Sequence, residues 1–354
     1  MKVGIHTCPF NDLNGLTKKH VKILEYNNID YVLLNSNEPD FLAKLREIDH
    51  FIYIWGHRDD YTQLAHDILP VIENHYNIKC FPNQDTCWHY DNKIRQYLIL
   101  HQYDFPFTQS WIFYNDIKAP LDWIKQAELP VVFKLYGGAG SSNVILINSK
   151  RQAEKLIKKQ FSKGIKTNMI SDTNDLKFKE FNLYNFLKKK GRKAIKALTG
   201  EDRYRKLNWG RHTNYVLFQK FLPKNDFDTR VSVIGGRAFA FRRFNRKDDF
   251  RSSGSGLINY EVDKINLEFI KIALDISKKL NFQSMAYDFL YNENGEPEFC
   301  EISYVYKDSA VYDCKGYWDS DLQFHEGHFW PQYFQLVDFL ELPDLKQPNL
   351  PRVL

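Results

Sequence analysis

The sequence is poor in cysteine and has no long apolar run. Its five cysteines are scattered over 354 residues and never spaced as CxxC, which indicates neither a disulfide framework nor a zinc ribbon. No apolar run approaches the ~20 residues needed to cross a bilayer. The start, MKVGIHT, also lacks the charged-then-apolar pattern of a secretory signal. We therefore expect reduced thiols, no transmembrane segment and a cytoplasmic location.

Two common site motifs are missing as well. The chain has no GxxxxGK[ST] segment, and its glycine-rich loop at 137–142 does not match GxGxxG in a strand–helix setting. A P-loop or a dinucleotide-binding fold is therefore disfavoured. The segment HEGH at 325–328 lacks the i, i+4 histidine spacing of HExxH, which disfavours a zinc site there.

The net charge of +5 is unevenly distributed along the chain. Residues 151–211 carry 18 Lys and Arg against 6 Asp and Glu, a local charge of +12. This segment lacks the interleaved aromatic residues of single-strand binders and any DNA-binding motif, so nucleic acid is not an expected partner. A solvated helix is the default interpretation, and a polyanionic substrate or an anionic membrane surface stays open.

Residues 1–90 alternate short apolar runs with helical patterns, which predicts an α/β layer with a mostly parallel sheet. From about residue 91 the texture changes. The runs PVVFK and NVILI flank the glycine-rich loop and predict a hairpin, and a lysine-rich insertion follows at about 160–211. We predict a central domain over 91–214. A C-terminal domain over 215–342 would contain several strands, one amphipathic helix and an aromatic tail.

The strongest chemical signal is the predicted hairpin MAYDFLYNENGEPEFCEIS. A two-residue type I′ turn at Asn294 and Gly295 would place Asp288 directly opposite Glu301, with Ser303 on the same face. Opposed carboxylates repel on a structural surface, and a hard divalent cation such as Mg²⁺ removes that conflict. An exposed hairpin with its charges in water is the competing interpretation.

Two further segments favour an anionic ligand. Lys134 ends an apolar strand beside the glycine-rich loop, where backbone N–H groups and a lysine could approach phosphate. Six arginines follow within one hairpin and its loop, where planar guanidinium groups could clamp phosphate or carboxylate; they are Arg230, Arg237, Arg242, Arg243, Arg246 and Arg251. A turn and a solvated basic face are the structural alternatives.

In their order along the chain, these pieces resemble the ATP-grasp superfamily. The matching segments are DNK at 91–93, VVFKLYGGAGSS, FQKFLP, DTRVSVIGG, DFRSSGSG, and YDFL with CEIS. They are most similar to the branch of ribosomal-protein glutamate ligases and glutathione synthetases, over roughly residues 82–303. The resemblance implies an ATP-grasp fold, α/β and α+β, preceded by a Rossmann-like domain.

The resemblance also implies the cofactors ATP and Mg²⁺ and a role for each matching residue. The residues that would bind ATP, through phosphates, the loop over them, adenine or ribose, are Lys93, Lys134, Gly138, Gly140, Gln219, Lys220, Leu222 and Asp228. Catalytic arginines that stabilise the transferred phosphoryl group would be Arg230, Arg243 and Arg251, with Arg242 as the alternative to Arg243. The Mg²⁺ ligands would be Asp288, Glu301 and Ser303.

The implied activity is that of an ATP-dependent carboxylate–amine ligase that forms an amide through an acyl phosphate. A small-molecule or saccharide carboxylate and an amine acceptor are the expected partners, an acidic sugar of a surface polysaccharide among them, and a homo-oligomer stays open. Ser303 stands where the family usually has asparagine, and Ser253 departs likewise from Arg-Ser-Asn. A kinase acting on a hydroxyl group and a non-catalytic nucleotide-binding module are therefore the alternatives.

Overall fold

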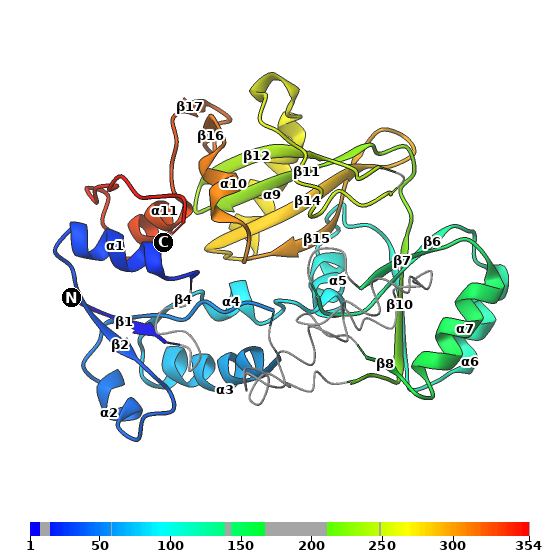
Figure 1. The fold of residues 1–354 in the computed structure, drawn as a ribbon, viewed down its shortest axis with the longest axis horizontal. Helices are drawn as coiled ribbons and strands as arrows, with labels where there is room; N and C mark the ends of the chain where they lie inside the picture. The colour runs from blue at the N-terminus through cyan, green and yellow to red at the C-terminus, as the bar shows by residue number, and fades with distance from the viewer. Residues whose placement is uncertain (8–14, 58, 139–142, 167–210, 248, 354) are drawn as a thin grey trace, which may run out of the picture. The chain divides into compact units, whose positions relative to one another are not determined.

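The structure of the protein is a computed structural model. It describes residues 1–7, 15–57, 59–138, 143–166, 211–247 and 249–353. They divide into two compact units, shown as a ribbon in Figure 1. The first unit contains residues 1–108 and 222–354, and the second contains 109–221. The domain boundaries predicted near residues 90 and 214 stay a prediction, and most of the basic insertion lies outside the described residues.

The first unit begins with a parallel sheet in the order β2-β1-β3-β4. Its strands are β1 (Lys2–His6), β2 (Asp30–Leu34), β3 (His50–Ile52) and β4 (Lys79–Phe81). Helices connect them, as parallel pairing requires: α1 (Lys18–Tyr26), α2 (Phe41–Leu45) and α3 (Asp59–His75). All four strands therefore end at one edge of the sheet, which agrees with the predicted alternation of strands and helices.

Two helices, α4 (Gln84–Cys87) and α5 (Lys93–Gln102), follow this sheet in the chain. The Asn92 side chain caps α5 by accepting hydrogen bonds from the backbone N–H groups of Ile94 and Arg95. Gln96 Nε2 donates a 2.9 Å hydrogen bond to the carbonyl oxygen of Ile302. The start of α5 is therefore fixed against the last hairpin strand of the same unit.

The second sheet of the first unit is seven-stranded, in the order β15-β14-β11-β12-β16-β17 with β13 beside β12. Its strands are β11 (Phe227–Ile234), β12 (Arg237–Phe244), β13 (Ile258–Asn259), β14 (Ser284–Tyr291), β15 (Pro297–Ser303), β16 (Gly316–Trp318) and β17 (Phe324–Glu326). After the short helix η1 (Val262–Lys264), α9 (Leu267–Lys279) packs on one face, where Phe269 stacks on Phe289 with ring centroids 4.8 Å apart. The predicted apolar face of this helix is buried.

The aromatic tail belongs to the first unit. It contains α10 (Asp308–Tyr312), β16, β17 and α11 (Pro331–Phe339). Lys19 of α1 forms a 2.7 Å ion pair with Asp308, and His20 bonds Gln335 at 2.9 Å. The tail thus links α1 to the seven-stranded sheet, because α11 contacts both α1 and β11. Figure 1 shows α11 beside α1.

The second unit contains the antiparallel sheet β5-β10-β6-β7. Its elements are β5 (Ser110–Tyr114), α6 (Lys118–Gln126), β6 (Val131–Lys134), β7 (Val144–Ile147), α7 (Lys150–Gln160), β8 (Ile165–Lys166), β9 (Arg211–His212) and β10 (Tyr215–Lys220). Lys134 pairs with Val144 across the glycine-rich hairpin, so this predicted hairpin is confirmed. Across residues 1–7, 15–57, 59–138, 143–166, 211–247 and 249–353, no helix is long and apolar enough to cross a membrane.

Three buried histidines predict acid sensitivity of the fold. Burial lowers the pKa of His6, His20 and His89 from 6.5 to about 4. The unfolded chain therefore binds protons that the folded chain excludes, so stability should fall between pH 6.5 and pH 4, by up to about 1.4 kcal/mol per pH unit for each histidine. Urea unfolding at pH 7 and pH 5 measures this loss.

The variant His89→Phe keeps a ring against Phe282 and should reduce the pH dependence. His101→Gln, which changes an exposed histidine, serves as the matched control. An identical slope in wild type and His89→Phe would contradict the assignment of this proton linkage to buried imidazoles.

Candidate active site

A row of alternating charges crosses three strands of the seven-stranded sheet. Arg243 on β12 lies opposite Asp228 on β11, and two residues along β11, Arg230 lies opposite Asp288 on β14. Each arginine makes a bidentate contact. Arg243 donates to Asp228 at 2.7 and 2.6 Å, and Arg230 donates to Asp288 at 2.7 and 2.8 Å. Opposite charges facing each other across strands stabilise this register.

The row is a connected network because Arg243 Nη2 also lies 2.8 Å from Asp288 Oδ2. The side chains of Arg243 and Asp288 are each only 8% exposed. Burial by itself would raise the pKa of Asp288, but the guanidinium groups of Arg230 and Arg243 outweigh it and hold that pKa well below its ordinary value. Asp288 is therefore a permanent anion neutralised by two arginines.

The row settles which neighbouring arginine faces the carboxylates. Arg243 does, and Arg242 points to the other side of β12, where its guanidinium carbon lies 5.0 Å from the Phe227 ring centroid. The predicted convergence of six arginines is therefore wrong for Arg242, and it is also wrong for Arg237. Arg237 lies at the far end of β12 and pairs with Asp338 at 2.9 Å, because the strand is eight residues long.

Arg251 lies on the loop after β12, where it bonds Asp249 at 2.6 to 3.0 Å. Arg246, on the same loop, donates to the carbonyl oxygen of Ser253 at 2.6 Å. The arginines predicted as one cluster thus have separate local partners, and two of them, Arg230 and Arg243, form the row.

The last hairpin differs from the predicted one. Asn292 N–H bonds the Glu296 carbonyl, and Gly295 N–H bonds the Asn292 carbonyl. The turn therefore has three residues and ends in Gly295 with φ +80°. Two-residue type I′ geometry at Asn294 and Gly295 is wrong, because one more residue lies between the paired strands.

The register of β14 and β15 shifts between Tyr287 and Phe289. Tyr287 pairs with Ile302 and Phe289 pairs with Phe299, which leaves Cys300 and Glu301 at a bulge beside Asp288. Asp288 is therefore opposed by two residues, Cys300 and Glu301, rather than by Glu301 alone. Each carboxylate instead has its own cationic partner, which removes the repulsion on which the argument for a shared metal depended.

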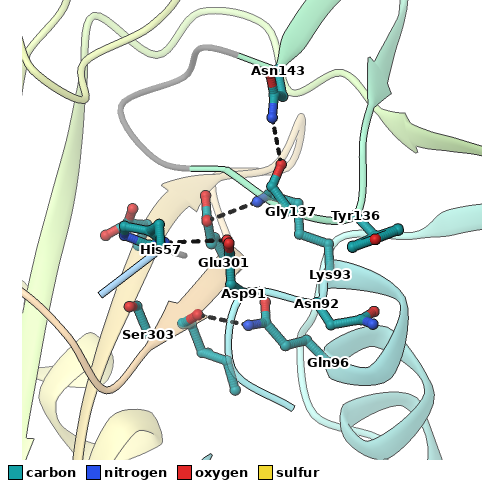
Figure 2. A network of polar contacts seen from close by, with 12 residues as sticks. His57, Asp91, Asn92, Lys93, Gln96, Tyr136, Gly137, Asn143, Glu301 and Ser303 are labelled. Carbon is teal, nitrogen blue, oxygen red and sulfur yellow. Dashed lines mark hydrogen bonds and ion pairs between the residues drawn. The ribbon is translucent and has the colours of Figure 1, made fainter. Parts of the chain in front are cut away.

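Glu301 pairs with Lys93 at the start of α5, with Lys93 Nζ 3.2 Å from Glu301 Oε1 (Figure 2). The Lys93 side chain is 6% exposed, whereas that of Glu301 is 34% exposed. Burial opposes the charged ammonium, but the carboxylates of Glu301 and Asp91 outweigh it, so the pKa of Lys93 is raised. Two predicted residues, 208 positions apart in sequence, are thus in contact.

Ser303 lies two residues beyond Glu301 on β15, so both point to the same side of the strand. Its hydroxyl donates a 2.7 Å hydrogen bond to the carbonyl oxygen of Val305. The donor of the hydroxyl is thereby used, while its oxygen lone pairs remain able to accept or to bind a cation.

Three residues beside the pair of Lys93 and Glu301 were not predicted to have a role. They are His57, Tyr90 and Asp91. His57 Nδ1 lies 3.3 Å from Asp91 Oδ1, and the Tyr90 hydroxyl lies 3.2 Å from the same nitrogen. His57 follows β3 at the carboxyl edge of the parallel sheet, where ligands of α/β folds bind. That rule is the one sequence signal that could have found it.

Three of the other predicted nucleotide-binding residues, Lys134, Gln219 and Lys220, lie in the second unit. Lys134 is buried at the end of β6, and Gln219 of β10 donates to the Ser110 hydroxyl at 3.2 Å. Lys220 is the last residue of β10. Leu222, which begins the second segment of the first unit, is buried.

The glycine-rich loop is anchored at both described ends. Asn143 Nδ2 donates to the Gly137 carbonyl at 2.7 Å. Gly138 has φ +107°, and a Cβ there would lie 2.2 Å from Asn143 Nδ2, so the position requires glycine. Gly140 lies outside the described residues.

The oxygen donors fit Mg²⁺ in part. Glu301 and Ser303 supply hard oxygen atoms on one face, and Glu301 is half-exposed. Both oxygens of Asp288 accept from arginine, so this residue fits a metal only after an arginine exchanges partners. Within the described ranges, no three His, Cys, Asp or Glu side chains group as a metal cage. Such a metal would therefore need phosphate oxygens and water as further ligands.

Solved structures of similar fold were found. A carboxyaminoimidazole ribonucleotide synthase from Aspergillus clavatus, complexed with ATP, has 13% identity and a TM-score of 0.57, covering 98% of this chain and 78% of its own. A Campylobacter jejuni biotin carboxylase has 10% identity and a TM-score of 0.55, with 99% and 72% covered. The macrocyclase MdnC from Microcystis aeruginosa, bound with precursor peptide MdnA, has 12% identity and a TM-score of 0.51, with 86% and 92% covered.

These structures show that the chain has the ATP-grasp fold, so the predicted fold is confirmed. No protein-family profile matches the sequence. No curated protein matches it either. Placement in the branch of ribosomal-protein glutamate ligases and glutathione synthetases, and the roles of individual residues, stay predictions.

The charge row predicts different costs for two neighbouring substitutions. Arg243→Met removes the cation that contacts both buried aspartates and should lower the free energy of unfolding by about 3–5 kcal/mol. Arg242→Met, the matched control on the opposite face, should cost about 1 kcal/mol or less. Urea unfolding of both variants at pH 7 measures the difference, and equal costs would contradict the network.

Proposed function

We propose that the protein is an ATP-dependent ligase that joins a carboxylate to an amine through an acyl phosphate and releases ADP and phosphate. The observation that carries this proposal is the pairing of Lys93 with Glu301 beside the buried row of Arg230, Arg243 and Asp288, in a chain with the ATP-grasp fold. Solved structures with this fold include one complexed with ATP.

The chemistry needs cations where the phosphoryl group is transferred. A carboxylate attacks the γ-phosphate in line, and charge spreads over the phosphoryl oxygens. Positioned cations lower the free energy of that transition state more than they would in water, because burial keeps them in place and desolvated. The proposed catalytic arginines are Arg230, Arg243 and Arg251.

Mg²⁺ would neutralise part of the triphosphate charge, held by Glu301, Ser303 and, after partner exchange, Asp288. The residues proposed to bind ATP are Lys93, Lys134, Gly138, Gly140, Gln219, Lys220, Leu222 and Asp228. In the structure, Lys93 and Arg243 use their charge on internal carboxylates. Nucleotide binding would transfer these cations to phosphate, an exchange of charge partners rather than a desolvation of new ions.

The carboxylate is proposed to be a small acid, either an amino acid or an acidic sugar used for a cell-surface polysaccharide, activated in the cytoplasm. Acyl phosphates hydrolyse in water, so the site is proposed to exclude water during turnover.

The proposal predicts Mg-dependent formation of hydroxamate from hydroxylamine, ATP and an acid from a panel of uronic acids and amino acids. Glu301→Gln should lower the rate of hydroxamate formation about 100-fold. The substitution removes the negative charge of a residue that is both a proposed metal ligand and the partner of Lys93. Glu298→Gln, on the same strand, should leave the rate unchanged. The measurements are ADP release and colorimetric hydroxamate.

Two results would contradict the proposal. One is ADP formation with a hydroxyl acceptor and no hydroxamate with any acid, which would indicate a kinase. The other is the absence of Mg-dependent ATP turnover, which would indicate a nucleotide-binding module.

A further inference from the structure

A histidine lies beside the candidate site and faces a carboxylate rather than solvent. His57 and Asp91 have side chains that are 21% and 15% exposed, with His57 Nδ1 3.3 Å from Asp91 Oδ1. Figure 2 shows this contact next to Glu301. Tyr90, which is buried, places its hydroxyl 3.2 Å from Nδ1 and 3.4 Å from Nε2 of the same ring.

The local backbone holds Asp91 in this role. Asp91 has φ +51°, a left-handed conformation that aspartate tolerates better than most residues. Asn92 caps helix α5, and the Asp91 carboxylate lies against the His57 ring. An acceptor at Nδ1 favours the tautomer with the proton on Nδ1, which makes Nε2 the basic nitrogen.

The charge around His57 differs from that of the arginine row. Glu301, the proposed metal ligand, pairs with Lys93, and Asp91 is the carboxylate that lies against His57 and supplies an acceptor beside its ring. Anions bind among arginines, whereas an amine binds where hydrogen-bond acceptors and negative charge gather. The His57 end therefore suits the amine substrate, and the arginine row suits phosphate and carboxylate.

The place of His57 in the fold supports a ligand contact. In the sheet order β2-β1-β3-β4, the chain changes direction between β1 and β3. Small molecules bind at such switch points, outside the carboxyl ends of the strands. His57 is five residues beyond β3, at that edge.

We infer that His57 is a catalytic residue of the second half-reaction, with Asp91 as its positioning residue. The amine nitrogen forms a bond to the acyl carbon, the bond from that carbon to the phosphate oxygen breaks, and phosphate leaves with the electron pair. One proton of the attacking amine passes to Nε2 of His57. The inference rests on the proposed ligase function and adds the group that receives this proton.

The experiment separates the two half-reactions. Hydroxylamine serves as the amine, with the acid that gives most hydroxamate in the panel above. Acyl phosphate formation is measured as ADP formed in rapid quench without hydroxylamine, and amine transfer as the dependence of hydroxamate rate on hydroxylamine concentration. The variants are His57→Ala, His57→Gln and Asp91→Asn, with His75→Gln, an exposed histidine at the end of α3, as the control.

His57→Ala should keep the ADP burst and lower kcat/KM for hydroxylamine about 100-fold, with partial rescue by added imidazole. Asp91→Asn should show a smaller loss confined to the same step, and His75→Gln no loss. Equal losses in both half-reactions, or no loss in amine transfer, would overturn the assignment while the ligase function stands. A wild-type protein that forms no hydroxamate would overturn the ligase function, and the inference with it.

Discussion

Buried charges that neutralise one another are the constraint on which the rest of the first unit depends. Removing any one charge of the row would leave an unpaired ion buried in a desolvated site, which is costly. The row consists of Arg230, Asp288, Arg243 and Asp228. Their mutual contacts lock the strands β12, β11 and β14 in one register. The same contacts hold the guanidinium groups of Arg230 and Arg243 against Asp288, a carboxylate that could otherwise bind a metal.

The two sheets of the first unit supply the two halves of the candidate site. The seven-stranded sheet carries the row and Glu301, while the loop after β3 carries His57 and the segment after β4 carries Asp91 and Lys93. Helix α5 joins them through Lys93 and the bond of Gln96 to the β15 backbone. The first unit therefore contains a cationic region and an acidic region, which is the arrangement that the proposed reaction between an anionic donor and an amine requires.

Sequence patterns predicted the strands and the amphipathic helix, because the apolar runs of the strands and the buried face of α9 leave a direct signal in the sequence. They could not predict the bulge in β15, because the predicted register assumed that each residue of one strand pairs with one residue of the other. They could not predict the turn either, because Asn294-Gly295 suits a two-residue and a three-residue turn alike. Which of Arg242 and Arg243 faces the carboxylates also depends on register. His57 belongs to no motif, so the sequence could have indicated it only by its place after β3, and the tertiary contact with Asp91 identifies it.

The most direct measurement of the central claim is a crystal structure with Mg²⁺ and a non-hydrolysable ATP analogue. The account predicts that the metal binds Glu301 and that Lys93 and at least one arginine of the row change partners from carboxylate to phosphate. A nucleotide bound elsewhere, with the pairs Lys93–Glu301 and Arg230–Asp288 intact, would contradict it.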